Sequence, residues 1–305
     1  MLAEEATRME AITDGLPMSA VPNVTPVTDV SGLLWRSVKI DTRGPLMSDS
    51  INEPQVGEDT VHYHMHVHEV HREPLTSEGY EPVVQATTRG PIEMRHYPVA
   101  GSIKGAIFVG GAGGGFDTPV RGWLYPRLCS ELQSDGITGL RVRYRQPNEL
   151  EECVLDVLAG ISFLEAADVN SVALVGHSFG GAVVIQAAAL SPTVRTCVAL
   201  STQSYGTAPA ADLGPLCSLL LAHGLDDEIL PPDCSRGVYD AARQPKQLLL
   251  KDRVRHGLDE WADELPGLIR AWVLAELGKP QPQPESLASS DPSFPSTTEA
   301  HDGHE

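Results

Sequence analysis

Ser178 lies in a five-residue motif whose residue types suit a serine nucleophile. The motif, Gly-His-Ser-Phe-Gly at residues 176–180, follows an apolar run at 172–175 and precedes small residues from Gly181 onward. In a sharp strand-to-helix turn the central serine is strained, and a Cβ atom at either flanking position would collide with neighbouring backbone. The pattern predicts a Ser178 hydroxyl at the end of a strand and beside a helix N-terminus, where N–H groups stabilise negative charge.

An acidic residue and then a histidine follow Ser178 along the chain. Serine, acid and histidine in this order are expected for a serine hydrolase whose nucleophile lies in such a turn. The apolar run at 216–222 leads into a loop with Asp226 and Asp227, and the run at 246–250 leads into a loop with His256. A serine hydroxyl attacks an acyl carbon well only when a base removes its proton, and an imidazole oriented by a carboxylate is such a base. The sequence predicts Ser178, His256 and one of the two aspartates as the reacting groups.

A glycine-rich segment, Val-Gly-Gly-Ala-Gly-Gly-Gly at 109–115, continues from the apolar run at 106–109. Such segments bind phosphate in some proteins, but this one lacks the Gly-Lys-Ser/Thr ending of a P-loop. It also lacks a full Gly-x-Gly-x-x-Gly motif with an acidic residue after the next strand. A phosphate-binding interpretation is therefore disfavoured.

These motifs together resemble those of the α/β-hydrolase superfamily, over roughly residues 83–277. Segment 109–115 is similar to the family's loop after the third strand, and 176–181 to its nucleophile elbow. Segment 223–231 is similar to the family's acid loop, which implies Asp227 as the acid. A one-residue slip of that loop leaves Asp226 as the alternative.

The same resemblance implies further roles and one absence. The oxyanion hole would be formed by the backbone N–H groups of Phe179 and Ala112. His177 and His223 would have structural places and are the less favoured alternatives to His256 as the base. The stretch between 200 and 216 is too short for a cap domain, which implies an open site as in dienelactone-hydrolase-like and small serine esterase members.

The apolar pattern also predicts the fold class without the family. Buried-strand runs alternate with helical patterns, which is typical of an α/β protein with a mostly parallel central sheet and helices on both faces. The expected strands are 106–109, 140–142, 172–175, 194–200, 216–221 and 247–250, preceded by an antiparallel hairpin of 83–87 and 92–97. The expected helices are 120–133, 149–167, 181–190, 233–242 and 258–277.

Composition divides the 305 residues into one folded domain with flanking segments. We expect a largely irregular leader at 1–60, a histidine-rich segment and extra strand at 61–82, the hydrolase domain at 83–278, and a disordered acidic tail at 279–305. The net charge of −19 argues against nucleic acid as a partner.

No run has the length of a membrane span, and the N-terminus lacks the basic and apolar regions of a signal peptide. The five cysteines show no paired spacing. We therefore expect a soluble cytoplasmic protein with reduced cysteines and no membrane partner. The sequence leaves the oligomeric state open.

Alternating histidines precede the domain. As one strand, residues 61–68 would place His62, His64, His66 and His68 on one face. Neighbouring imidazoles on that face would be about 7 Å apart, wide for a single metal site. A solvated edge-strand face is therefore favoured over a zinc or nickel site, and no metal is predicted.

The sequence thus predicts a hydrolase without cofactor that cleaves a small carboxylic ester, thioester or lactone through an acyl-enzyme on Ser178. Amide hydrolysis, acyl transfer or perhydrolysis on the same three residues is one alternative, and a non-catalytic binding protein on the same fold is another. Arg143 and Tyr205 are candidate substrate contacts, although surface arginines at a strand exit are the commoner explanation for Arg143.

Overall fold

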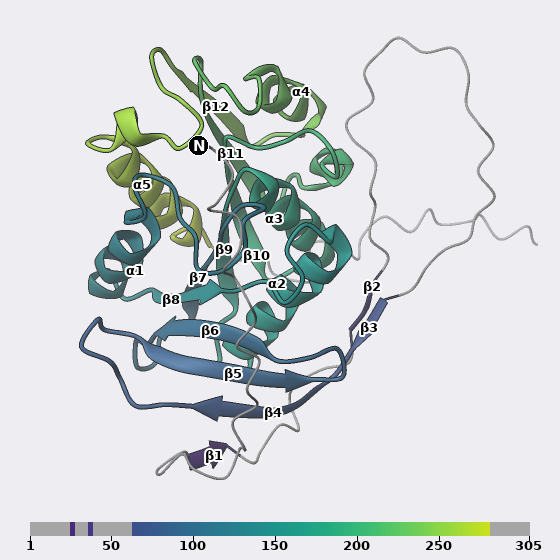
Figure 1. The fold of residues 1–305 in the computed structure, drawn as a ribbon, viewed down its shortest axis with the longest axis vertical. Helices are drawn as coiled ribbons and strands as arrows, with labels where there is room; N and C mark the ends of the chain where they lie inside the picture. Colours follow the sequence, from purple (N-terminus) through teal and green to yellow (C-terminus); the bar gives the residue numbers. More distant parts are fainter. Residues whose placement is uncertain (1–24, 28–35, 39–62, 281–305) are drawn as a thin grey trace, which may run out of the picture.

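The computed structural model describes residues 25–27, 36–38 and 63–280, and its centre is a large twisted sheet (Figure 1). Ten strands form this sheet in the order β1-β4-β5-β6-β8-β7-β9-β10-β11-β12. Their bounds are β1 Thr25–Val27, β4 Val67–Arg72, β5 Glu81–Thr87, β6 Ile92–Tyr97, β7 Lys104–Val109, β8 Thr138–Val142, β9 Ser171–His177, β10 Val194–Leu200, β11 Ser218–Gly224 and β12 Lys246–Lys251.

The sheet has an antiparallel part and a parallel part. Strands β1, β4, β5 and β6 pair antiparallel with one another, and β6 pairs antiparallel with β8. From β8 to β12 every neighbouring pair is parallel. The carboxyl ends of these parallel strands meet at one edge, which is where open α/β sheets place their ligand sites.

Helices cover the two faces of the parallel part in separate layers (Figure 1). One face packs against α1 (Leu124–Ser134) and α5 (Leu265–Leu277), and the other against α2 (Leu150–Glu165), α3 (Phe179–Leu190) and α4 (Asp233–Ala241). Each face has its own apolar cluster, so β9 and β11 are buried along their whole length. This is the predicted fold class, and the described residues contain no cap domain between β10 and β11, only the 3₁₀ turn η1 (Ala208–Asp212).

Several predicted boundaries are wrong, and for the two helices the reason is local backbone conformation. The helix expected from residue 120 begins at Leu124, because Val120, Arg121 and Gly122 all have positive φ angles. The helix expected from 258 is divided into the 3₁₀ turn η2 (Asp259–Trp261) and α5, after Leu258 in the left-handed region. The strand expected at 216–221 is displaced to Ser218–Gly224.

The N-terminal segments add strands that the apolar pattern did not indicate. β1 pairs with β4, and β2 (Arg36–Val38) pairs with β3 (Tyr63–Met65) in a separate two-stranded sheet. The other residues of the expected leader and the expected tail from 281 lie outside the described residues, so the division into segments stays a prediction.

The histidine-rich segment is not one continuous strand. It is divided at His66 between β3 and β4, and the pairing of β4 with β5 shifts register between Val67 and Glu69. As a result Met65 and Val70, five positions apart, are both buried. His62 lies outside the described residues. Among all residues that the structure describes, no three or more His, Cys, Asp or Glu side chains form a cluster suited to a metal.

None of the helices that the structure describes combines the length and apolarity needed to cross a bilayer. All five cysteines are unpaired.

Candidate active site

Ser178 occupies the sharp turn between β9 and α3. β9 ends at His177, Ser178 has φ 57° and ψ −121°, and α3 begins at Phe179. A Cβ atom on Gly176 would lie 2.1 Å from the carbonyl oxygen of Gly180, closer than atoms can approach. The strained serine and the glycine requirement agree with the nucleophile elbow predicted from the sequence.

Asp227 and His256 meet across two loops at the same edge. The Oδ2 atom of Asp227, which follows β11, is 2.8 Å from Nδ1 of His256, which follows β12. The Asp227 side chain is completely buried, whereas His256 keeps 15% of its side chain exposed. Asp226 is exposed, and its backbone N–H donates to Val254. The structure therefore brings Asp227, not Asp226, to the histidine.

The Asp227 carboxylate accepts hydrogen bonds at both oxygens. Oδ1 accepts from the N–H groups of Ile229 at 2.9 Å and Leu230 at 2.8 Å, and Oδ2 lies 3.0 Å from Nε2 of His223 in addition to His256. Burial alone would raise the pKa of Asp227, but the hydrogen bonds from Leu230, His256 and Ile229 together outweigh it and lower the pKa. Asp227 is therefore ionised at neutral pH.

His177, the residue before the nucleophile, holds the loop of His256. Its Nε2 atom is 2.9 Å from the His256 carbonyl oxygen, which also accepts from the Ser201 hydroxyl at 3.2 Å, and the two rings lie 4.9 Å apart. Burial lowers the pKa of His177 to about 4, so the neutral ring donates from Nε2. The expected structural place of His177 thus has a specific contact.

The Ser178 hydroxyl and His256 Nε2 both lack a hydrogen-bond partner among the described residues. Neither atom makes a hydrogen bond there, while Ser178 N–H donates to Leu200 O at 2.8 Å. Catalytic hydrogen bonds are often long before substrate binds, so this geometry is compatible with a serine and base pair.

The glycine-rich loop passes directly beside Ser178. A Cβ atom on Gly111 would lie 3.4 Å from the Cβ of Ser178. The backbone N–H groups of Phe179 and Ala112 have no hydrogen-bond acceptor among the described residues. Two unused N–H groups beside a nucleophile are what an oxyanion hole requires, although their roles remain predictions.

Residues at the end of β8 hold this loop, and the sequence reasoning missed them. The hydroxyl of Tyr144 donates to Gly110 O at 3.3 Å, and its ring packs edge-on against Phe179. The buried Arg141 donates to Phe116 O. An arginine within an otherwise apolar strand was the sequence signal that could have indicated such a contact.

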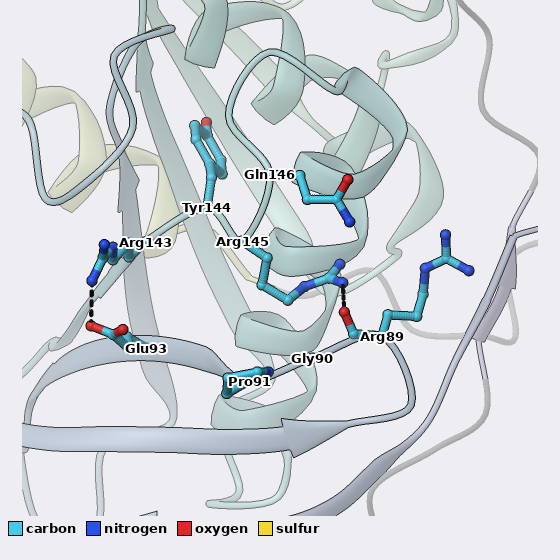
Figure 2. Close-up of a pocket in the computed structure, with 8 residues that line it drawn as sticks. All are labelled: Arg89, Gly90, Pro91, Glu93, Arg143, Tyr144, Arg145 and Gln146. Atoms are coloured by element: carbon cyan, nitrogen blue, oxygen red, sulfur yellow. Dashed lines mark hydrogen bonds and ion pairs between the residues drawn. The ribbon is translucent and has the colours of Figure 1, made fainter. Parts of the chain in front are cut away.

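Arg143 and Tyr205 make no hydrogen bond or ion pair with Ser178, Asp227 or His256 among the described residues. Figure 2 shows Arg143 directed toward Glu93, with a 2.8 Å ion pair between two half-exposed side chains. Arg143 and Glu93 both line a cavity of about 300 Å³, whose other lining residues are 89–91 and 144–146. Tyr205 is exposed on the loop after β10. Their roles as substrate contacts stay predictions.

Arg145 forms a buried ionic cluster beside the same cavity (Figure 2). Its guanidinium binds Asp156 and Glu152 of α2 and donates to Arg89 O at 2.8 Å. Arg89 in turn pairs with Glu152. These contacts join the segment after β8 to α2 and to the β5–β6 turn, which gives Arg145 a structural role.

The sequence and fold place the chain in a known class of proteins. The sequence profile of the alpha/beta hydrolase family matches residues 106–301, and the chain belongs to this family. No curated protein matches the sequence.

Solved structures share the fold at low sequence identity. Est1E from Butyrivibrio proteoclasticus is 15% identical with a TM-score of 0.51, and covers 62% of this chain and 96% of its own. The dienelactone hydrolase from Anabaena variabilis is 16% identical with a TM-score of 0.52, over 62% and 94%. A serine hydrolase without lid from Xanthomonas campestris is 18% identical with a TM-score of 0.52, over 67% and 97%.

Proposed function

We propose that this hydrolase cleaves a small carboxylic ester, thioester or lactone through an acyl-enzyme on Ser178. The observation that supports this most directly is the bond of 2.8 Å between the buried Asp227 and Nδ1 of His256. It leaves Nε2 of His256 as the only ring nitrogen able to accept a proton. In this proposal the Ser178 hydroxyl, on the turn at the end of β9, supplies that proton.

The reaction would proceed in two steps. Ser178 Oγ attacks the acyl carbon while its proton moves to His256 Nε2, and Asp227 stabilises the imidazolium that forms. The N–H groups of Phe179 and Ala112 bind the oxyanion. Collapse breaks the bond to the leaving group, which takes the proton from His256. Water then attacks the acyl-enzyme with His256 again as base, which releases the acid and restores Ser178.

The edge of the sheet that carries the proposed site is open among the described residues. The described residues between β10 and β11 form a short turn and no cap, so little protein encloses a bound acyl group. Amide hydrolysis, acyl transfer and perhydrolysis on the same residues are alternatives, since fold does not determine substrate. The five unpaired cysteines support a reducing, cytoplasmic location within this proposal.

A fluorophosphonate probe tests the nucleophile. We expect a covalent adduct on Ser178, mapped by mass spectrometry, and a loss of at least about 10⁴-fold in turnover of a short-chain aryl ester for Ser178→Ala. Ser204→Ala is the matched control at the same edge and should keep both labelling and turnover. A wild-type protein that is folded yet unlabelled would instead favour a non-catalytic binding protein.

A further inference from the structure

His223, at the end of β11, is enclosed between α4 and the acid loop. Its side chain is completely buried, and Nδ1 is 2.7 Å from the hydroxyl of Ser235, which is also buried, in the first turn of α4. The other ring nitrogen, Nε2, lies 3.0 Å from Leu230 O and 3.0 Å from Asp227 Oδ2. Every polar atom of the ring is therefore engaged.

The partners determine where the protons are. A carbonyl and a carboxylate only accept hydrogen bonds, so Nε2 of His223 must carry a proton. Burial lowers the pKa of His223, so the ring is neutral and Nδ1 has a lone pair. The Ser235 hydroxyl must then donate to Nδ1. Donation therefore runs from Ser235 to His223, and the Nε2–H of His223 donates to Leu230 O while also facing Asp227 Oδ2 at 3.0 Å.

This chain of donors completes the coordination of the carboxylate. An ionised carboxylate offers about four acceptor positions. Asp227 accepts from Ile229 N–H, Leu230 N–H and His256, and the remaining position on Oδ2 faces the Nε2–H of His223, which is shared with Leu230 O. His223 and His256 share Oδ2, so the two imidazoles draw on the same negative charge.

We propose that Ser235 and His223 are positioning residues that fix the Asp227 carboxylate against His256 and moderate the basicity of His256. The proposal rests on the proposed function for its kinetic part. Without the Ser235 hydroxyl, the His223 ring can place its proton on Nδ1 and turn a lone pair toward Asp227. The carboxylate then loses one donor, and its charge acts more strongly on His256.

The groups in printed contact with His256 are not altered by Ser235→Ala. Asp227 is the carboxylate bonded to its ring, Glu228 accepts from its backbone N–H at 3.4 Å, and the neutral His177 ring lies 4.9 Å away. A change in the His256 pKa after substitution of Ser235 can therefore be assigned to Asp227.

Ser235→Ala in the full chain tests the proposal by two readouts. NMR titration of the His256 ring should show its pKa raised by about half a unit, which corresponds to part of one hydrogen bond. Turnover of an aryl ester should fall about five- to tenfold in kcat, with KM within about twofold, because the acid is less well fixed in the transition state.

Ser218→Ala is the matched control. Ser218 begins the same strand, is equally buried, and its hydroxyl lies 2.8 Å from Thr196 Oγ1. Its loss should lower the thermal midpoint about as much as Ser235→Ala, but leave the His256 pKa and kcat unchanged. If Ser235→Ala matches this control in both readouts, the contact is structural only and the proposal is wrong.

His223 itself provides a second comparison. In His223→Gln the amide nitrogen reaches the place of Nε2 and can still donate to Asp227, whereas in His223→Asn it reaches only the place of Nδ1. We expect His223→Gln to keep the His256 pKa closer to wild type than His223→Asn, and the reverse ranking would contradict the proposal. NMR titration needs no turnover, so a shifted His256 pKa with an unlabelled Ser178 would refute the proposed function and leave the hydrogen-bond chain standing.

Discussion

Two buried charges lie at the same edge of the sheet, and they are compensated in different ways. Asp227 has no cationic side chain of Lys or Arg bound to it among the described residues; it accepts from the N–H groups of Ile229 and Leu230 and from His256 Nδ1, with His223 Nε2 3.0 Å from Oδ2. Arg145, with 4% of its side chain exposed, is surrounded by carboxylates, the buried Asp156 and the mostly buried Glu152.

The difference distinguishes the proposed reactive site from a cluster with a structural role. Opposite charges satisfy each other, and removing either leaves a buried group without its partner. Neutral donors stabilise Asp227 without cancelling its charge, so the carboxylate can still favour a positive charge on His256 during a reaction. We infer that the acid loop serves chemistry and that the arginine cluster serves the fold.

Asp227→Asn should give the largest change in kcat, and it alters only the Asp227 site and not the Arg145 cluster. The amide keeps the shape but removes the charge and the acceptor that fixes the His256 tautomer, so we expect kcat to fall about 10³- to 10⁴-fold with the fold intact. Asp226→Asn, next in sequence but exposed, should change kcat by less than about threefold. Steady-state kinetics and circular dichroism check both variants, and a reversed ranking would move the acid to Asp226.

Arg145→Met should lower stability and leave turnover unchanged, the reverse of Asp227→Asn. It leaves Asp156 buried without its partner, so the free energy of unfolding should fall by about 3–5 kcal/mol, while kcat per folded molecule stays near wild type. Arg143→Met removes a half-exposed pair and should cost less than about 1 kcal/mol. Denaturant unfolding measures both, and equal losses would mean that burial does not distinguish the two arginines.

Acid should lower the free energy of unfolding through His177, which holds the His256 loop next to Asp227. The pKa of His177 is about 4 in the folded protein, against an ordinary value of 6.5. Between pH 4 and pH 6.5 the histidine is therefore protonated in the unfolded chain but neutral in the folded one. Stability from this residue is complete above pH 6.5 and is lost as the pH falls toward 4, by about 3 kcal/mol.

The matched variant for this prediction is His177→Gln, which keeps a donor for His256 O but cannot titrate. Its thermal midpoint should fall less than that of wild type between pH 7.5 and pH 4.5. Parallel curves for the two proteins would show that His177 does not contribute to the acid response.

The nucleophile elbow could be predicted from the sequence because its requirements are local. Gly176 and Gly180 are needed because a Cβ atom at either position would collide with a backbone carbonyl oxygen. Both glycines lie within five consecutive residues, so the requirement is visible in the sequence. The parallel sheet was equally readable, since strands such as β9 and β11 are buried on both faces and therefore continuously apolar. Asp227 needed the family resemblance, because its neighbour Asp226 has the same chemistry.

Contacts between distant segments could not be predicted in this way. Ser235 lies 12 residues after His223, and Arg145 is held by Glu152, Asp156 and the backbone of Arg89. Nothing in the spacing of these residues indicates that they meet, because their proximity depends on how α2 and α4 dock on the sheet. The start of α1 was missed because Val120 and Arg121 adopt positive φ angles that their residue types disfavour.

The unequal crowding of the reacting groups has an evolutionary consequence. The turn around Ser178 allows almost no substitution, since a side chain on Gly176 or Gly180 would strike backbone. The acid loop, by contrast, presents Ile229 with 64% of its surface exposed, two residues after the fixed Asp227. Substitutions at Ile229 should therefore be tolerated by the fold where those at Gly176 or Gly180 are not, so the two loops differ in how freely their sequences can vary.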